Sequence, residues 1–452
     1  MPVTQHEVTA SNDQSGLLAI VGATVIDGTG ADPIYDGIVV LDGDHIVAVG
    51  DRSLPVPSTA RAITVDGMFV IPGLMCTNTY IADAAWTPLN VRYEDRYDEV
   101  AIESAQLALK GGVTSIFDMW GPRDGLLKAR DDINRGAVTA ARIFVCGNWV
   151  GMSGPYGPDM RPTQRETVGE TFASRIDTRV SAGVGHELAR MTVDEVRQRV
   201  REYLESGVDY LRYLANAHRI GQWDLTVFST RVQQAIIEEG HRAGVLVIAQ
   251  QASTDESINV ALDCGADLLG IIADHPLRKE TLERIARNQV PYFTTGGYSD
   301  AELTEARRDN VPVLEAYESW NINERLAIQL GAFLCDGSFS YPDSPDLAAD
   351  RHLYGPGGAK QLGVGHILGL GGLQKNFGVS PMDALLTATR NVARAFNVDK
   401  DLGTLEQGKK ADLVILEGNP LENVENYRRI HAVVKDGKIV DRDALPTQRL
   451  MT

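Results

Sequence analysis

Two charged residues in largely apolar stretches have side chains suited to acid–base chemistry. Asp336 ends the apolar run in GAFLCDGS, residues 331–338, and Arg212 interrupts VDYLRYLAN, residues 208–216. A carboxylate in a partly apolar pocket can act as a general acid or base. A guanidinium can bind a carboxylate through two hydrogen bonds or stabilise an oxyanion. The alternatives are a loop-capping role for Asp336, or a buried ion pair between the two residues that only balances charge.

Other polar residues at the ends of apolar stretches, or in the loops that follow, complete the candidate site. Tyr80 could donate a proton, and His218 could serve as acid or base near neutral pH. The residues that we expect to hydrogen-bond substrate or line its pocket are Asn78, Gln250, Gln251, Asp118, Asn148, Tyr156 and Tyr298. For Tyr80, Asn78, Gln250 and Gln251 the alternative is a polar network that fills interior space, and for His218 it is an exposed loop position.

Eight apolar stretches alternate with helical patterns along the middle of the chain. They cover residues 70–80, 113–120, 141–149, 208–216, 245–252, 266–274, 290–297 and 331–338. Strands that alternate with helices in this number predict an α/β fold of the (β/α)8, TIM-like barrel type. In such barrels the chemistry lies at the C-terminal ends of the strands, which is where the polar candidates fall.

Two of the predicted helices carry start signals. Thr192 and Glu195 form a capping-box pattern, in which each side chain satisfies a backbone N–H of the other residue. Apolar residues then recur every four positions and predict one buried face, at Val196, Val200 and Leu204. Ser380 and Pro381 predict the cap and first turn of the last long helix.

Both ends of the chain predict short strands with tight turns. Asp-Gly pairs at 42–43, 66–67 and 436–437 lie between apolar runs and predict hairpins, because such turns require a positive φ. The shared style suggests one small β-sandwich built from both termini. We therefore predict a disordered lead-in over 1–16, a sandwich domain of 17–69 plus 400–452, and a barrel of 70–399.

Composition bounds the partners and the compartment. The 452 residues carry a formal net charge of -18, which argues against nucleic acid or an anionic membrane as partner. No apolar run approaches a membrane span, and the first residues lack the features of a signal peptide. Four scattered cysteines suit a reducing cytoplasm. We expect a cytoplasmic homo-oligomer that acts on a small molecule and needs no cofactor, since no dinucleotide or phosphate-binding motif is present.

Several fragments resemble the amidohydrolase superfamily, in the branch of imidazolonepropionase-like and prolidase-like proteins. They include GGVTSIFDM at 111–119 and ATRNVARAFNVDKDLGTLEQGKKADLVILEGNPLENV at 388–424. The similarity extends from about Ala19 to about Val440. It implies a barrel followed and preceded by strands of one β-sandwich, in agreement with the pattern of apolar stretches.

The resemblance also implies a binuclear metal site, and five of its six ligand positions are changed. The positions that correspond to the family's histidines, carboxylated lysine and aspartate are, in chain order, Asn78, Tyr80, Arg212, Gln250, Ile271 and Asp336. A histidine of the prolidase-like loop corresponds to Tyr156. Amides are poor zinc ligands, and a fixed positive charge repels a dication. We predict no metal at this place; a relocated ion could use His218, His275, His352 or His366.

These features predict a metal-independent enzyme of the amidohydrolase fold. Hydrolysis of an unactivated amide is hard without metal-bound hydroxide, so we favour proton transfer of the lyase, isomerase or cyclase type. Asp336 would be the general acid or base, and Arg212 would stabilise an anion or oxyanion of a small anionic or carbonyl-bearing molecule. The alternatives are a metal-free hydrolase of an activated ester, lactone, imide or C–N bond, and a non-catalytic binding protein.

Overall fold

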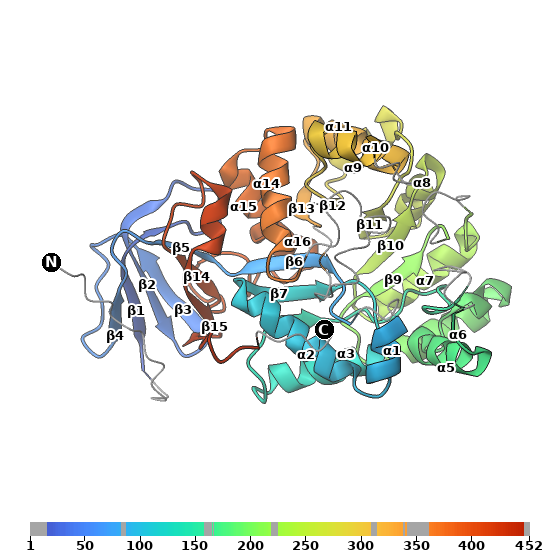
Figure 1. Cartoon of the computed structure of the whole chain (residues 1–452), viewed down its shortest axis with the longest axis horizontal. Helices are drawn as coiled ribbons and strands as arrows, with labels where there is room; N and C mark the ends of the chain where they lie inside the picture. Colours follow the sequence, from blue (N-terminus) through green and yellow to red (C-terminus); the bar gives the residue numbers. More distant parts are fainter. Residues whose placement is uncertain are drawn as a thin grey trace.

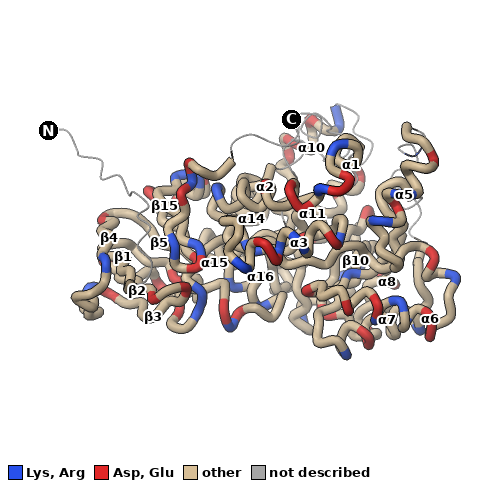
Figure 2. Tube along the Cα trace, turned by 90° about the horizontal axis from the view of Figure 1, so that it is seen from below, with Lys and Arg blue, Asp and Glu red and all other residues tan. Residues whose placement is uncertain are grey.

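The computed structural model describes residues 16–82, 87–157, 165, 167–217, 225–308, 314–337, 340 and 361–446 (Figure 1). Strands from both ends of the chain form one part, and alternating strands and helices form the other. Within the described ranges no helix has both the length and the apolar character to cross a bilayer. Figure 2 shows acidic and basic segments interspersed along both parts.

The terminal strands form one hydrogen-bonded sheet of eight strands in the order β16-β15-β14-β5-β1-β2-β3, with β4 paired to β1. The strands are β1 (Leu18–Val25), β2 (Ile34–Asp42), β3 (His45–Gly50), β4 (Arg61–Thr64), β5 (Phe69–Pro72), β14 (Leu413–Leu416), β15 (Ile430–Lys435) and β16 (Lys438–Ile439). Apolar side chains of both termini share one core, in which Val39 and Leu41 pack with Leu413 and Val434. Both ends of the chain therefore build this sheet together.

Two details of the N-terminal strands differ from the prediction. The stretch 70–80 forms two strands, because Gly73 separates β5 of the terminal sheet from β6 (Leu74–Thr79) of the barrel. The domain division that we predicted at residue 70 therefore falls inside β5. The Asp-Gly pair at 66–67 does not make a hairpin, since β4 and β5 both pair with β1 in parallel. The pairs at 42–43 and 436–437 do join antiparallel strands.

Each predicted apolar stretch of the barrel contains a strand. The strands are β6, β7 (Val113–Asp118), β8 (Arg142–Phe144), β9 (Leu211–Leu214), β10 (Val247–Ala252), β11 (Leu268–Ile271), β12 (Tyr292–Thr294) and β13 (Leu334–Asp336). Parallel pairing joins β6 to β8 in one group and β9 to β13 in the other. Two parallel bridges, Val150 to Tyr213 and Thr79 to Ser340, connect these groups on both sides. The pairing therefore closes a ring of parallel strands.

Helices lie around this ring (Figure 1). They are α1 (Thr87–Tyr93), α2 (Tyr97–Lys110), α3 (Arg123–Asn134), α5 (Glu170–Ser181), α6 (Val193–Leu204), α7 (Thr230–Arg242), α8 (Asp255–Asp263), α9 (Lys279–Arg287), α10 (Asp300–Arg308), α11 (Leu314–Gln329), α14 (Gly365–Phe377), α15 (Pro381–Thr387) and α16 (Arg390–Ala395). Short 3-10 helices are η1 (His186–Arg190) and η2 (Val424–Arg428).

The predicted helix start signals are present in the structure, with two differences. The Thr192 hydroxyl and the Glu195 carboxylate form the capping box of α6. Val196 and Val200 are buried as predicted, but Leu204 is only half-buried and Tyr203 completes the buried face. Ser380 and Pro381 begin α15, yet that helix ends at Thr387 and α16 follows separately. The last long helix of the prediction is therefore two short ones.

The barrel interior is apolar at one end. Six strands contribute to one buried cluster through Met75, Phe117, Leu214, Ile248, Leu268 and Cys335. Phe396, directly after α16, stacks on Phe117 with 4.0 Å between ring centroids. Ala388 and Asn391 hydrogen-bond the backbone at the beginnings of β6 and β13. The segment that contains α15 and α16 therefore covers the N-terminal end of the strands, and the C-terminal end is left for the candidate site.

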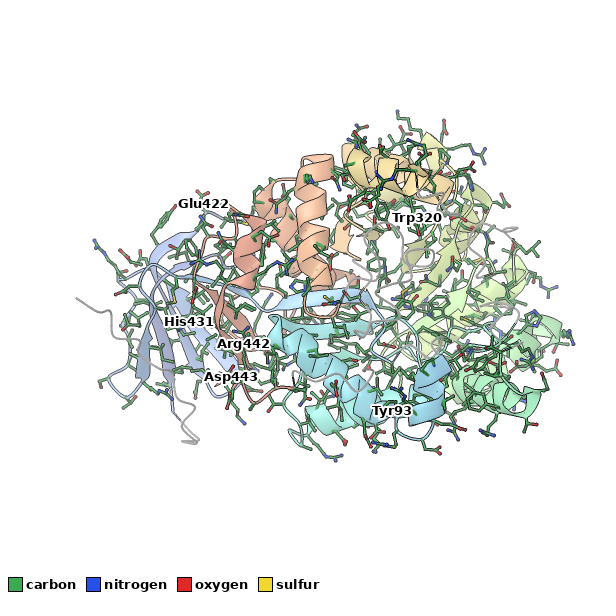
Figure 3. All side chains as sticks on the ribbon, viewed as in Figure 1. Tyr93, Trp320, Glu422, His431, Arg442 and Asp443 are labelled. Carbon is green, nitrogen blue, oxygen red and sulfur yellow. The ribbon has the colours of Figure 1, made fainter. Side chains whose placement is uncertain are left out.

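A charged network joins the barrel to the terminal sheet. Arg142 on β8 donates to Asp412 at 2.7 Å and to Asp436 at 2.5 Å, and Lys435 lies 3.6 Å from Asp412. Burial favours the neutral acid, but Arg142 and Lys435 outweigh it and lower the pKa of Asp412. Arg442, labelled in Figure 3, adds hydrogen bonds to backbone oxygens of α2 and β15. Paired charges therefore stabilise this junction.

His366, on α14, is a buried titratable group outside the barrel strands. Within the described part of the chain, neither of its ring nitrogens has a hydrogen-bond partner. Burial, with a smaller contribution from Arg428, lowers the pKa of His366 to about 3. The folded chain therefore keeps this imidazole neutral at pH values where the unfolded chain would protonate it.

We predict that Asp412→Ala destabilises the protein by about 3 kcal/mol, because Arg142 and Lys435 would keep buried charges without their shared partner. The free energy of unfolding in urea measures this loss. Glu202→Ala is the control, since it removes an exposed pair with Arg199 and an exposed hydrogen bond from Gln198, and should cost below about 1 kcal/mol. Equal effects of the two substitutions would show that the network does not stabilise the junction.

We predict that His366→Leu makes stability less sensitive to acid. Between the ordinary pKa of 6.5 and about 3, the unfolded chain binds a proton at residue 366 that the folded chain does not. Acidification through this window therefore costs the wild type up to about 1.4 kcal/mol per pH unit. Urea unfolding from about pH 8 to about pH 5 would reveal the shallower slope of the variant.

The control for this measurement is Tyr427→Phe, which changes another buried polar group without an acidic titration. The hydroxyl of Tyr427 on η2 is also buried with no hydrogen-bond partner among the described residues. This variant should keep the slope of the wild type. If the stability of His366→Leu depended on pH as steeply as that of the wild type, the lowered pKa of the buried His366 imidazole would be contradicted.

Candidate functional site

Buried polar side chains collect toward the C-terminal ends of the barrel strands. Each is at most 5% exposed, and they are Asn78 on β6, Asp118 on β7, Arg212 on β9, Gln250 and Gln251 on β10, and Asp336 on β13. We call Asn78, Arg212, Gln250, Gln251 and Asp336 the strand-end cluster. Parallel strands of a barrel present these ends at one face, so sequence-distant residues can meet there.

The alternation of β9 directs Arg212 into the barrel. The hydroxyl of the next residue, Tyr213, donates to Gln233 on the surrounding helix α7 at 3.0 Å. Successive residues of a strand point to opposite faces, so Arg212 faces the interior when Tyr213 faces the helix layer. The Arg212 side chain is fully buried.

Neutral groups hold the guanidinium of Arg212. Its Nη1 atom donates to Oε1 of Gln250 at 2.8 Å and lies 3.5 Å from Oδ1 of Asn78. The guanidinium carbon lies 5.7 Å from the ring centroid of Tyr210. Across the described ranges, Nε and Nη2 have no hydrogen-bond partner. Arg212 thus makes no hydrogen bond to Asp336. These contacts therefore do not form the charge-balancing ion pair that was the alternative for the two residues.

Gly270 on β11 makes room for the Gln250 side chain. The two residues are paired across β10 and β11, and a Cβ at position 270 would collide with Oε1 of Gln250. Any larger residue would push Gln250 away from Arg212. We did not single out Gly270 from the sequence, although a lone glycine inside an apolar strand is a known sign of a close approach.

Two residues of the cluster have a left-handed backbone. Asn78 has φ 50° and Gln251 has φ 56°. The pairing of β6 with β7 shifts register between Cys76 and Thr79, and that of β10 with β11 shifts beside Gln251. Such bulges re-aim side chains, and unfavourable backbone angles in non-glycine residues collect at functional sites. Both irregularities fall at strand ends of the cluster.

Asp336 lies at the seam between β13 and β6. Its backbone oxygen accepts a hydrogen bond from the Thr77 hydroxyl. Burial mainly, and the Asp336 carboxylate in addition, raise the pKa of the thiols of Cys76 and Cys335. The carboxylate is therefore close to β6 as well as to its own strand. Next along the chain, Gly337 is near Asn78, whose Nδ2 would lie 3.1 Å from a Cβ there.

Asn78 thus connects the two charged residues of the cluster. Its Oδ1 faces Arg212 and its Nδ2 faces the end of β13. Asp118 is close to the same region, since both its carboxylate and the Arg212 guanidinium act on the pKa of Tyr210. An oxygen of Asp118 accepts from the backbone N–H of Ile81 at 3.2 Å.

Other predicted pocket residues are engaged elsewhere. Asn148, predicted to line the pocket, accepts from Trp120 at 2.8 Å and donates to the oxygen of Met152 at 2.8 Å, so its amide belongs to an internal polar network. The hydroxyl of Tyr156 donates to Thr87 of α1 at 3.2 Å. Tyr298 packs against Tyr317, with 4.9 Å between ring centroids.

Tyr80 and His218 complete the list of predicted residues. Tyr80 follows β6, is 9% exposed, and its backbone N–H donates to Ser340 at 2.9 Å. His218 lies outside the described residues, as does His352. The structure therefore brings Arg212, Gln250 and Asn78 into contact, with Asp336 beside Asn78.

The described donors do not fit the family's metal pair. Apart from Asp336, the corresponding positions hold amides, a phenol, an isoleucine and the guanidinium of Arg212, which repels cations. No group of three or more His, Cys, Asp or Glu among the described residues could hold a metal ion. His366 is on α14, and His275 contacts Asn323 through its backbone oxygen.

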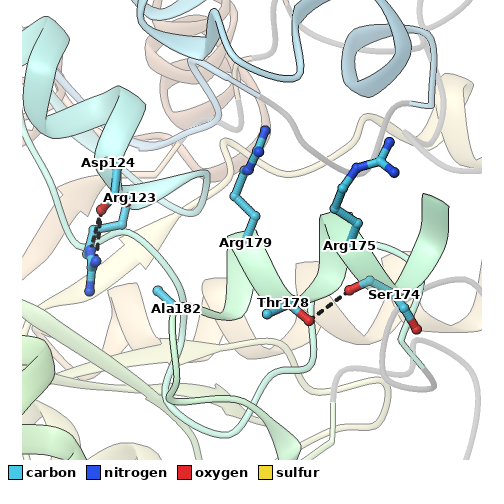
Figure 4. Close-up of a pocket in the computed structure, with 7 residues that line it drawn as sticks. All are labelled: Arg123, Asp124, Ser174, Arg175, Thr178, Arg179 and Ala182. Atoms are coloured by element: carbon cyan, nitrogen blue, oxygen red, sulfur yellow. Dashed lines mark hydrogen bonds and ion pairs between the residues drawn. The ribbon is translucent and has the colours of Figure 1, made fainter. Parts of the chain in front are cut away.

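A shallow surface pocket of about 570 Å³ lies between α3 and α5 (Figure 4). Its arginines are paired with acidic residues: Arg123 with Asp124 at 2.8 Å, Arg175 with Glu94 at 2.6 Å, and Arg179 with Asp95 at 2.8 Å. These charges already have carboxylate partners, in contrast to that of Arg212 as far as the described residues go.

Comparisons with known proteins agree with this architecture. A sequence profile of the amidohydrolase family matches residues 364–440. Ochratoxinase from Aspergillus niger is 24% identical over 465 residues, which cover 96% of this chain and 88% of that protein. Imidazolonepropionase from Geobacillus is 28% identical over 47% of this chain and 44% of that protein.

Two solved structures are more similar. Molinate hydrolase is 32% identical with a TM-score of 0.88 and 97% of both chains covered. Phenylurea hydrolase B is 32% identical with a TM-score of 0.89, covering 96% of this chain and 99% of that one. Together with the ring of parallel strands, they confirm the predicted fold and resemblance. This chain belongs to the amidohydrolase superfamily.

Proposed function

We propose that this protein is a hydrolase that cleaves an activated carbonyl bond, of the C–N or ester type, in a small molecule. Asp336 acts as general base and Arg212 stabilises the oxyanion, without the family's metal pair. This was the alternative in the sequence analysis, which favoured lyase or isomerase chemistry. The names of the two relatives at 32% identity, both hydrolases, support the hydrolytic alternative.

The observation that carries the proposal is the buried guanidinium of Arg212, whose Nε and Nη2 atoms have no hydrogen-bond partner among the described residues. Donors fixed in a water-poor interior stabilise developing negative charge far better than donors in water, since they need no reorganisation. Gln250 and Asn78 hold this guanidinium through its remaining terminal nitrogen. The donors are therefore oriented before substrate binds.

The proposed reaction uses one water molecule. Its oxygen attacks the carbonyl carbon while Asp336 takes a proton from it, and the carbonyl oxygen gains negative charge next to Arg212. The tetrahedral intermediate then expels the leaving nitrogen or oxygen. Asp336 returns its proton to this leaving group, so that the acid product, the protonated leaving group and the original carboxylate balance the equation.

This machinery suits activated substrates. In a metal-dependent hydrolase, the ion lowers the pKa of its bound water and so generates hydroxide at neutral pH. A carboxylate base only assists water during the attack. Carbonyl compounds with a good leaving group, such as aryl carbamates, imides or lactones, need less assistance.

The cytoplasmic location and homo-oligomeric state remain predictions from the sequence.

We predict that Asp336→Asn lowers kcat/KM by about 100-fold or more, because general-base assistance is lost while the shape is kept. Release of product from a panel of aryl carbamates, ureas, imides and lactones measures the effect. Asp194→Asn, on the exposed first turn of α6, is the matched control and should retain wild-type activity.

Reaction in water labelled with heavy oxygen separates hydrolysis from the other two readings. A hydrolase incorporates the label into the acid product, whereas a lyase or isomerase of the kind favoured from the sequence converts substrate without it. Ligand binding without any turnover in the wild type would instead support a binding protein. Undiminished activity in Asp336→Asn would rule out the role of this carboxylate.

A further inference from the structure

One edge of the Arg212 guanidinium is available for a ligand. Its Nη1 atom is used by Gln250 and Asn78, and the two nitrogens without a partner among the described residues are Nε and Nη2. In arginine, the Nε–H and one Nη2–H bond point in parallel from the same edge of the plane. This pair is the fork that binds both oxygens of a carboxylate at once.

We infer that the Nε–Nη2 edge of Arg212 is a binding site for a planar carboxylate or carbamate, the acid product of the reaction. The inference rests on the proposed hydrolysis and names its substrate class as derivatives of carboxylic or carbamic acids. Cleavage leaves two oxygens on the former carbonyl carbon, one original and one from water. Two parallel donors match these two oxygens.

The electrostatic setting of Arg212 supports an anionic ligand. Other arginines with little exposure are paired with carboxylates: Arg142 with Asp412 and Asp436, and Arg130 with Asp131 and Asp209. The hydrogen-bond partners of Arg212 are neutral amides, although its side chain is completely buried. A buried charge whose hydrogen-bond partners are neutral is costly, so an anion that enters this site recovers part of that cost.

Neighbouring amides supply further donors. Within the described ranges, Nε2 of Gln250 and Nε2 of Gln251 are buried and have no acceptor. Both belong to β10, which pairs with the strand that carries Arg212. The Asp118 carboxylate acts on the same surroundings and opposes an anion, yet one of its oxygens is held by the N–H of Ile81. The donors on β9 and β10 therefore favour a single monoanion over a more highly charged group.

The test is a thermal-shift and calorimetric titration of the full chain with acetate, acetamide and chloride at equal ionic strength. Acetate has the two equivalent oxygens and the charge. Acetamide has the same shape without the charge, and chloride has the charge without the two oxygens. We expect acetate alone to raise Tm in a saturable way, because a ligand that binds only the folded state stabilises it.

Arg212→Lys keeps the charge and removes the fork, so it should weaken acetate binding at least about tenfold. Arg175→Lys is the matched control, since this half-exposed arginine pairs with Glu94 away from the barrel strands; it should bind acetate like the wild type. Equal responses to acetate and acetamide, or unchanged binding in Arg212→Lys, would overturn the inference. If Arg212→Lys fails to fold, the comparison of acetate with acetamide on the wild type decides alone.

Asp336→Asn keeps this result separate from the proposed function. It should bind acetate at least as tightly as the wild type, because it removes a neighbouring negative charge, while its turnover falls. Acetate binding in a protein that hydrolyses none of the panel would contradict the proposed reaction and leave the carboxylate site in place. Hydrolysis without specific acetate binding would contradict the site and leave the reaction in place.

Discussion

A fixed positive charge inside the barrel is the constraint on which the rest of the site depends. β9 directs Arg212 inward because Tyr213 is held by α7. Gln250 can reach the guanidinium only because position 270 has no side chain. Asn78 reaches it from a strained, left-handed backbone at a bulge in β6. Neighbouring strands thus accommodate a guanidinium at the place where the resemblance implies a carboxylated lysine.

Other weakly exposed arginines of the described chain, unlike Arg212, form ion pairs with carboxylates. At the junction of barrel and terminal sheet, Arg142 is matched by two aspartates, and such pairs hold elements together. Arg212 is matched by amide dipoles, which leave two of its nitrogens without a partner in the described residues. A charge arranged in this way contributes less to stability than a paired one, and in the proposed function it meets a negative charge that arrives with a ligand.

Much of the architecture could be predicted from sequence because it depends on local periodicity. All eight barrel stretches contain strands, and Asp42-Gly43 and Asp436-Gly437 make the expected turns. The hairpin predicted at Asp66-Gly67 was wrong, because the residue types of a turn do not indicate that both flanking strands pair with β1. The separation of β5 from β6 at Gly73 could not be predicted either, since one continuous apolar run contributes strands to two sheets.

The site was predictable in its residue types but not in its contacts. Arg212, Gln250 and Asn78 were named because the resemblance places them at ligand positions of the family's metal site, and they do meet. Their orientation depends on Gly270 and on register shifts, which arise only when strands pair. Asn148 was predicted to line the pocket, whereas its side chain bonds Trp120 and the backbone oxygen of Met152, because buried amides are satisfied by nearby polar groups.

The central claim is that a guanidinium has replaced the metal of this fold. Its most direct test measures metal content and turnover on the same purified sample, before and after exhaustive chelation. The account predicts far less than one metal ion per chain and unchanged hydrolysis of the activated carbonyl substrates after chelation. One tightly bound ion per chain, with activity that disappears on its removal and returns when it is restored, would contradict the account.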